Sequence, residues 1–216
     1  PRYRNAVAIG TRGDLYYLFI YVFIYLFADM SSHADAIRIH LASGPASARQ
    51  LVEIIGISQP TLSRALSELG EEVIRIGAAR SIQYTLRDTS RGLPEIPIYR
   101  VDAEGRIRQV STLIPTRPEG FVMYQEGGMA RHSDGLPWWL LDMRPQGYIG
   151  RAYAARHGAE LGLPARLIDW TDTHALRALL VHGHDVVGNL LLGDMARDRF
   201  LATTIPEPIP NEQRAA

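Results

Sequence analysis

A run of polar side chains between Ser58 and Ser67 has the residue types that recognise double-stranded DNA. An Arg guanidinium grips guanine or phosphate, a Gln amide pairs with adenine, and hydroxyl groups suit phosphate oxygens. No acidic residue occurs between Glu53 and Glu68. The segment therefore predicts duplex DNA as a partner, and the residues expected to contact it are Ser58, Gln59, Thr61, Ser63, Arg64 and Ser67.

Two short helices joined by a tight turn are predicted around this segment, after a first helix over residues 32–41. Ser47 and Gln50 have the spacing of a capping box, which predicts a helix over residues 47–55. Gly56 follows it and suits the positive φ of a C-terminal cap. A helix, a glycine turn and a second helix form the arrangement that lays a recognition helix in the major groove.

The predicted recognition helix begins at Ser58 and carries its apolar residues on one face. Leu62, Leu66 and Leu69 repeat at i, i+4 and i+7, so we expect them to face the core. The polar residues between them are then expected to face outward.

A two-stranded wing is predicted to follow, over residues 74–76 and 82–87, with a glycine-led tip at residues 77–81. In its second strand, alternation predicts that Gln83, Thr85 and Arg87 face outward. Such a wing would bring Arg75 or Arg80 to the DNA backbone or the minor groove.

Charge leaves a second interpretation of this module open. The chain has no net charge, and residues 31–88 hold six arginines and six acids. Small three-helix modules also mediate protein contacts, so docking of a partner protein or of a second copy of the chain is the alternative to DNA binding.

Two absences exclude several kinds of chemistry. The chain has no cysteine, which rules out disulfides, thiolate zinc sites and thiol catalysis. All 23 basic residues are arginine, so neither a Walker loop nor the usual protein-kinase phosphate clamp can be assembled from this chain alone.

An apolar run of 14 residues, 15–28, precedes the predicted module. A bilayer span needs roughly 20 residues, so we expect no membrane partner and a cytoplasmic protein. Residues 1–29 are interpreted as an apolar extension, translated upstream sequence or the end of something else. A signal or membrane segment, or a buried native helix, are the alternatives.

The rest of the chain predicts a second, α+β domain over residues 97–205, after a winged helix-turn-helix at 30–90 and before a tail at 206–216. Turn-rich residues 89–97 are interpreted as a linker. Helices are expected over residues 148–161 and 172–181. Strands are expected over residues 98–101, 106–114, 121–125, 186–192 and 200–203.

Two segments of this second domain resemble a known family. Residues 135–150 (GLPWWLLDMRPQGYIG) and 178–193 (ALLVHGHDVVGNLLLG) are similar to the N-terminal lobe of HipA-family serine/threonine kinases, which are toxins of bacterial toxin–antitoxin systems. The resemblance is strongest to the YjjJ-type subgroup, in which a winged helix-turn-helix precedes the kinase. It covers residues 31 to about 205.

The resemblance implies an ATP- and Mg-dependent kinase with its own DNA-binding module. Val187, Gly188 and Asn189 match the strand that lines the family's nucleotide site. The family's phosphate loop, catalytic Lys and Asp, and metal-binding Asp all lie beyond this lobe, so we expect the chain to be an N-terminal part without catalytic residues. It should bind no cofactor alone.

Three other groups have possible chemistry. His182, His184 and Asp185 offer metal ligands, but a third protein ligand besides the two histidines is not obvious. Trp138 and Trp139 are expected to pack in the core, with a binding platform as the alternative. Arg144 and Arg151 suit either a phosphate or a structural salt bridge.

Overall fold

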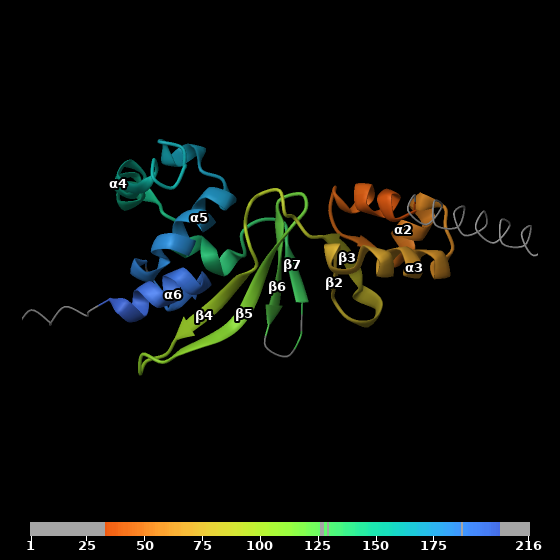
Figure 1. Ribbon diagram of the computed structural model, residues 1–216, viewed down its shortest axis with the longest axis horizontal. Coiled ribbons are helices and arrows are strands. Elements are labelled where there is room, and N and C mark those ends of the chain that lie inside the picture. The colour runs from red at the N-terminus through yellow and green to blue at the C-terminus, as the bar shows by residue number, and fades with distance from the viewer. Residues whose placement is uncertain (1–32, 126–127, 129, 187, 204–216) are drawn as a thin grey trace, which may run out of the picture. The chain divides into compact units, whose positions relative to one another are not determined.

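The structure is a computed structural model, and it describes residues 33–203 except 126–127, 129 and 187. These residues form two compact units that divide between Arg87 and Asp88. Each unit combines helices with an antiparallel sheet, so the predicted α+β class is confirmed (Figure 1). The predicted apolar segment 15–28 and the tail 206–216 lie outside the described residues.

The first unit contains three helices and a small sheet whose strand order is β1-β3-β2. The helices are residues 33–41, α2 (Ala48–Ile55) and α3 (Gln59–Leu69), followed by the 3-10 turns η1 (Gly70–Glu72) and η2 (Ala79–Ser81). The strands are β1 (Ala46–Ser47), β2 (Val73–Ile76) and β3 (Gln83–Leu86). The short strand β1 was not predicted, because two residues carry no alternation.

Local capping signals define the two helices as predicted. The Ser47 hydroxyl accepts the Gln50 backbone N–H, and the Gln50 side chain accepts the Ser47 N–H, so the capping box is present. Gly56 ends α2 with φ 73°, a conformation that costs glycine little. Ser58 caps α3 by accepting the Thr61 N–H.

The apolar face of α3 packs into the core of the first unit. Leu62 and Leu69 are buried, Leu66 packs against the same core, and Ala65 is buried between them. The prediction that these leucines face inward is confirmed. Full burial of one such side chain contributes about 1.5–3 kcal/mol.

Strand β3 corrects one prediction. Thr85 is predicted to face outward, yet it is completely buried, and its neighbour Leu86 is buried as well. Adjacent residues of a strand point to opposite faces, so both faces of β3 are covered here. The alternation rule predicts exposure only for a strand with one face in solvent, and it fails where both faces are covered.

The second unit is built on a five-stranded antiparallel sheet with the order β7-β6-β5-β4-β8. Its strands are β4 (Ile96–Val101), β5 (Ile107–Thr116), β6 (Gly120–Gln125), β7 (Ala130–Ser133) and β8 (Leu190–Leu192). Edge strand β7 was not predicted, because glycines and polar turn residues surround it. Strand β8 is shorter than the predicted strand 186–192.

Helices follow strand β7 in the chain, and the end of one of them occupies a segment that was predicted to be a strand. They are η3 (Trp138–Met143), α4 (Gly147–His157), η4 (Leu167–Asp169), α5 (Asp172–His182), η5 (Gly183–Asp185) and α6 (Gly193–Ala202). Residues 200–203 were predicted as a strand, but residues 200–202 end α6. Asp194 in its first turn and Arg199 in its last turn both suit the helix dipole.

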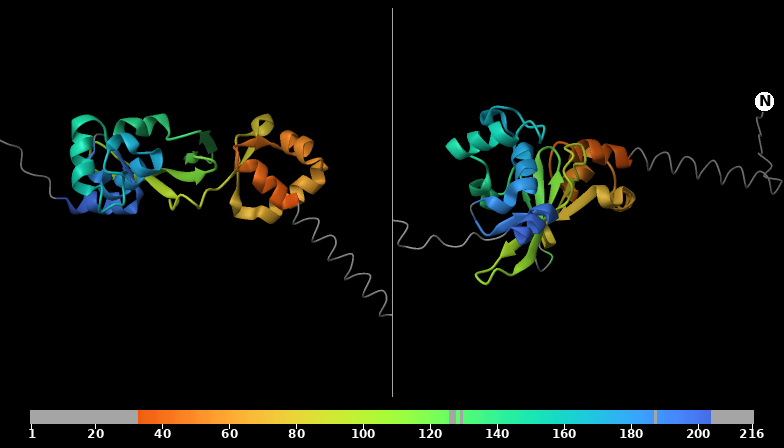
Figure 2. Two further views of the ribbon diagram at one scale, coloured as in Figure 1. Left: turned by 90° about the horizontal axis from the view of Figure 1, so that it is seen from above. Right: turned by 60° about the vertical axis from the view of Figure 1, so that its left-hand side comes forward.

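Helix α5 joins the helices to the sheet. Leu176 and Leu179 of α5 pack with Ile98, Phe121 and Leu192 in one buried cluster. Figure 2 shows that α5 lies between α4 and the sheet, with the helices of the second unit gathered on one side of its strands. Among the described residues, no helix combines the length and apolar character needed to cross a bilayer.

The segment predicted as a linker is instead fixed to the second unit. Asp88 is 2% exposed and accepts hydrogen bonds from the Ser90 hydroxyl and from Arg91 Nε at 2.7 and 2.8 Å. Arg91 Nη2 donates to the carbonyl oxygens of Thr116 and Gly120 at 2.9 and 2.7 Å. Turn-type residues suggested a linker, but these buried polar contacts hold the segment against β5 and β6.

Candidate nucleic-acid interface

The predicted recognition residues lie on the side of α3 opposite its buried leucines. Ser58, Gln59, Ser63, Arg64 and Ser67 are exposed. Thr61 is half-buried. The structure therefore brings the six residues onto one polar side of a single helix and its cap.

Some of these hydroxyl groups are already engaged within the helix. Ser58 Oγ accepts the Thr61 N–H at 3.3 Å and lies 2.9 Å from Thr61 Oγ1. Ser67 Oγ donates to the Ser63 carbonyl oxygen at 2.9 Å. In the part of the chain that the structure describes, Gln59 and Arg64 keep side chains without a partner. They are the groups most available to a ligand.

Two acidic residues of this unit, Asp35 and Glu72, are paired with the same arginine. Arg38 Nε donates to Glu72 Oε2 at 2.9 Å, Arg38 Nη2 donates to Glu72 Oε1 at 3.1 Å, and Asp35 pairs with the same guanidinium. The hydrogen bond with Glu72 raises the pKa of Arg38, and the same bond lowers the pKa of Glu72. The Glu72 carboxylate is thereby paired, although both side chains remain partly exposed.

The residues of the predicted wing are only partly described. Arg75 is exposed in β2, opposite Tyr84 of β3. The Arg80 side chain lies outside the described part of the structure. Within that part, Arg49, Arg64 and Arg75 form no ion pair, so the first unit retains free cationic groups despite its balanced composition.

The structure describes two of the three residues that match the family's nucleotide site. Val187 lies outside the described residues, while Gly188 and Asn189 are exposed. A Cβ on Gly188 would meet no atom within 4 Å, so its φ of 120° rather than crowding explains the glycine. The Asn189 carbonyl oxygen accepts the Val101 N–H at 2.9 Å, which extends the pairing of β4.

The histidines near the end of α5 belong to an aromatic cluster. The Tyr153 hydroxyl lies 2.6 Å from His182 Nδ1, and the His157 and His182 rings are 4.5 Å apart. Burial, followed by the neighbouring His157, lowers the pKa of His182, and burial raises the pKa of Tyr153 to about 12. Among the described residues, no three His, Cys, Asp or Glu side chains are grouped to hold a metal.

Arg144 has a structural partner. Its Nη1 donates to Asp172 Oδ1 at 2.8 Å, and Nη2 donates to the Trp170 carbonyl oxygen. Asp172 also accepts the Leu136 N–H. Arg144 therefore holds the DMRPQG segment to the start of α5. Arg151 lines a separate hollow of about 890 Å³ between α4 and η4.

The two adjacent tryptophans differ from the prediction that both are core residues. Trp139 is half-buried and packs against the cluster around the sheet. Trp138 is 80% exposed. The prediction fails for Trp138 because the 3-10 turn η3 directs its two neighbouring tryptophans differently.

Comparisons with known proteins concern both units. Residues 93–201 match the family described as YjjJ-like toxin, middle domain. Toxin YjjJ of Escherichia coli (strain K12) is 35% identical over 175 residues, which cover 81% of this chain and 39% of that protein. Since 129 residues follow Arg87, at least 46 of the matched residues lie in the first unit. No solved structure matches the chain significantly.

Proposed function

The chain belongs to the YjjJ-like toxin family, and we propose that its first unit is a winged helix-turn-helix that binds double-stranded DNA through α3. One observation supports this most: the outward side of α3 is polar, free of acids up to Glu68, and carries the unpaired Arg64. The leucines on the opposite side hold the helix to the unit. The residues proposed to contact DNA therefore do not contribute to the core.

Each part of the unit has a role in this proposal. Gln59 and Arg64 contact base edges or phosphates in the major groove, and Ser63 contacts a phosphate. Ser58 and Thr61 order the first turn of α3, where backbone N–H groups attract phosphate. Arg75 and Arg80 of the wing approach the backbone or the minor groove.

The test compares Arg64→Ala with the full unaltered chain in binding to a labelled duplex of mixed sequence. We expect affinity to fall about 5- to 150-fold, the usual cost of one Arg contact. Binding of the unaltered chain should also weaken steeply between about 50 and 200 mM salt. Fluorescence anisotropy measures both effects.

Arg106→Ala is the matched control. Arg106 is an exposed arginine of the second unit, paired with Asp102 in a hairpin turn. The substitution Arg106→Ala should leave duplex binding unchanged. Equal affinity of Arg64→Ala and the unaltered chain would reject α3 as the DNA-binding helix.

A second candidate, protein docking, has one observation in its favour. Ile39 and Ile54 of the first unit are 74% and 60% exposed, which offers apolar surface to an antitoxin or to a second copy of the chain. Sedimentation of the purified chain separates the alternatives. A dimer that Ile54→Ser dissociates, together with no retention on duplex DNA at low salt, would favour docking.

For the second unit we propose the N-terminal lobe of a HipA-like serine/threonine kinase toxin. The family match and the resemblance of residues 135–150 and 178–193 support this assignment. The chain spans 39% of the length of Toxin YjjJ, so phosphoryl transfer with ATP and Mg²⁺ is proposed for the whole protein. Incubating the complete gene product with labelled ATP tests this proposal. Failure to incorporate labelled phosphate into protein would contradict it.

A further inference from the structure

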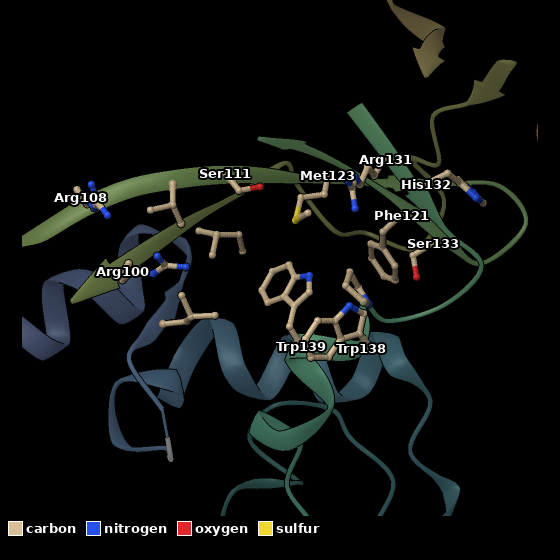
Figure 3. Close-up of a pocket in the computed structure, with 14 residues that line it drawn as sticks. Arg100, Arg108, Ser111, Phe121, Met123, Arg131, His132, Ser133, Trp138 and Trp139 are labelled. Carbon is tan, nitrogen blue, oxygen red and sulfur yellow. The ribbon is translucent and has the colours of Figure 1, made fainter. Parts of the chain in front are cut away.

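A groove of about 670 Å³ lies within the second unit, between the five-stranded sheet and the turn η3 (Figure 3). Neither the DNA-binding proposal nor the kinase proposal uses it. Sheet residues form one wall, and the two tryptophans of η3 rise from the other. The groove is lined by Ile98, Arg100, Arg108, Val110, Ser111, Phe121, Met123, Arg131, His132, Ser133, Pro137, Trp138, Trp139 and Leu190.

Positive charge is concentrated along the sheet wall. Arg100 of β4 and Arg108 of β5 are direct cross-strand partners, and Arg131 of β7 is paired with Met123 of β6. Like charges directly opposite each other destabilise a sheet. Among the described residues, none of the three guanidinium groups has a partner, and no carboxylate lines the groove. An anionic ligand between Arg100 and Arg108 would relieve their repulsion.

The facing wall supplies aromatic surface. Trp138 is 80% exposed beside the half-buried Trp139, and Phe121 and Met123 lie across from them (Figure 3). An exposed tryptophan at the mouth of a cationic groove is a surface on which a planar ring can stack. The groove therefore combines the two features that hold single-stranded nucleic acid, namely free arginines and stacking platforms.

The polar groups of the lining are mainly donors. The three arginines and the tryptophan ring N–H groups only donate, while Ser133 Oγ already donates to the Gly135 carbonyl oxygen. Ser111 is 9% exposed, and its Oγ has no partner. A buried hydroxyl without a partner costs free energy, so a ligand atom that bonds to it would be favoured.

We propose that this groove binds a short stretch of single-stranded nucleic acid, with phosphates at the arginines and a base stacked on Trp138. An acidic peptide fits less well, because its backbone N–H groups need acceptors that the lining lacks. The groove also crosses the face of a sheet whose strands β4, β5 and β6 already have partners on both sides. A peptide therefore has no strand edge to extend there.

The experiment titrates the full chain with a labelled oligothymidine of about ten nucleotides, within the site sizes known for such proteins. The chain carries Arg64→Ala, so that the first unit contributes little. We expect salt-dependent binding that Trp138→Ala weakens about 5- to 150-fold, the effect of losing one stacked base. The double variant Arg100→Gln/Arg108→Gln should weaken binding and reduce its salt dependence.

Two matched controls carry similar substitutions outside the groove. Tyr148→Ala removes an aromatic ring that is 79% exposed on α4, and Arg106→Gln removes an arginine from the turn of the same β4–β5 hairpin. Both should bind the oligonucleotide as the parent does. Far-UV circular dichroism confirms that each variant is folded, which is expected because every altered side chain is exposed.

Three results would overturn the assignment. They are no binding of the oligonucleotide at low salt, equal weakening by the groove variants and the controls, and binding of labelled poly-glutamate that is tighter than that of the oligothymidine and is weakened by the groove variants. The last result would assign the groove to an acidic peptide. Loss of duplex binding by the first unit affects none of these readouts, so the two proposals fail separately.

Discussion

The two units place their charges in opposite ways. In the first unit, the core around Leu62 is apolar and the polar side of α3 is exposed. In the second unit, Asp88 and Arg91 form a largely buried ion pair, and Arg91 donates to backbone carbonyl groups of neighbouring strands. The first unit can therefore change its outer residues at little cost to folding, whereas the second depends on buried charges for its architecture.

Tryptophan fluorescence allows this comparison to be tested unit by unit. The chain has three tryptophans, Trp138, Trp139 and Trp170, and all lie in the second unit. Their emission therefore reports unfolding of the second unit. Hydrogen exchange of α2 and α3 amide groups reports the stability of the first.

The largest expected effect is that of Asp88→Ala. Removing one partner of a buried ion pair leaves an uncompensated charge on Arg91, and the usual cost is about 3–5 kcal/mol. The midpoint of the fluorescence transition in urea should fall accordingly. Asp198→Ala, which breaks an exposed pair with Arg197, is the control and should leave the midpoint nearly unchanged. Equal midpoints for the two variants would show that buried charge does not hold this unit.

Leu62→Ala should destabilise the first unit and leave the second unit unchanged. Leu62 is completely buried in the core of the first unit, and such truncations cost about 2–5 kcal/mol. Protection of α2 and α3 amides should fall, while the fluorescence midpoint stays constant. A parallel fall in both readouts would mean that the units do not unfold independently.

Ser47→Ala tests a local contribution in the first unit. It removes the hydroxyl of the capping box at α2 and should cost about 1 kcal/mol. Hydrogen exchange at the first turn of α2 measures the loss. Ser43→Ala, at an exposed position in the preceding turn, is the control. No difference between the two would mean that β1 rather than the cap starts the helix.

Acid should lower the stability of the second unit, and we expect this to be the smallest of the four effects. Burial raises the pKa of Asp88, but hydrogen bonds from Ser90 and the guanidiniums of Arg91 and Arg117 outweigh it and hold that pKa below its ordinary value. The resulting stability is complete above the unfolded pKa of about 3.9 and is lost as the pH falls further through the folded pKa. Fluorescence midpoints measured across this range should fall, and Asp88→Asn should flatten the dependence.

Sequence patterns predicted the first unit better than the second for a physical reason. The caps at Ser47 and Ser58 and the leucines of α3 act within one or two turns of helix, so their spacing is visible in the chain. The contacts of Arg91 reach carbonyl groups 25 and 29 residues away, which no local pattern shows. The groove is likewise lined by residues that lie far apart in the chain, so no local pattern shows it.

Particular errors in the second unit follow from this difference. Residues 89–97 have the composition of a linker, yet distant partners fix them. The apolar residues near Phe200 were too few to distinguish a strand from the end of α6. Arg100 and Arg108 carried no signal until strand register placed them opposite each other. The opposite exposure of Trp138 and Trp139 likewise depends on the turn η3.

The most direct test of DNA binding is to follow the backbone amide resonances of the full chain during titration with duplex DNA. We predict that the largest shifts fall on residues 58–67 of α3 and its cap, with smaller shifts at β2. Shifts confined to the second unit, or to the exposed isoleucines at positions 39 and 54, would contradict a recognition role for α3.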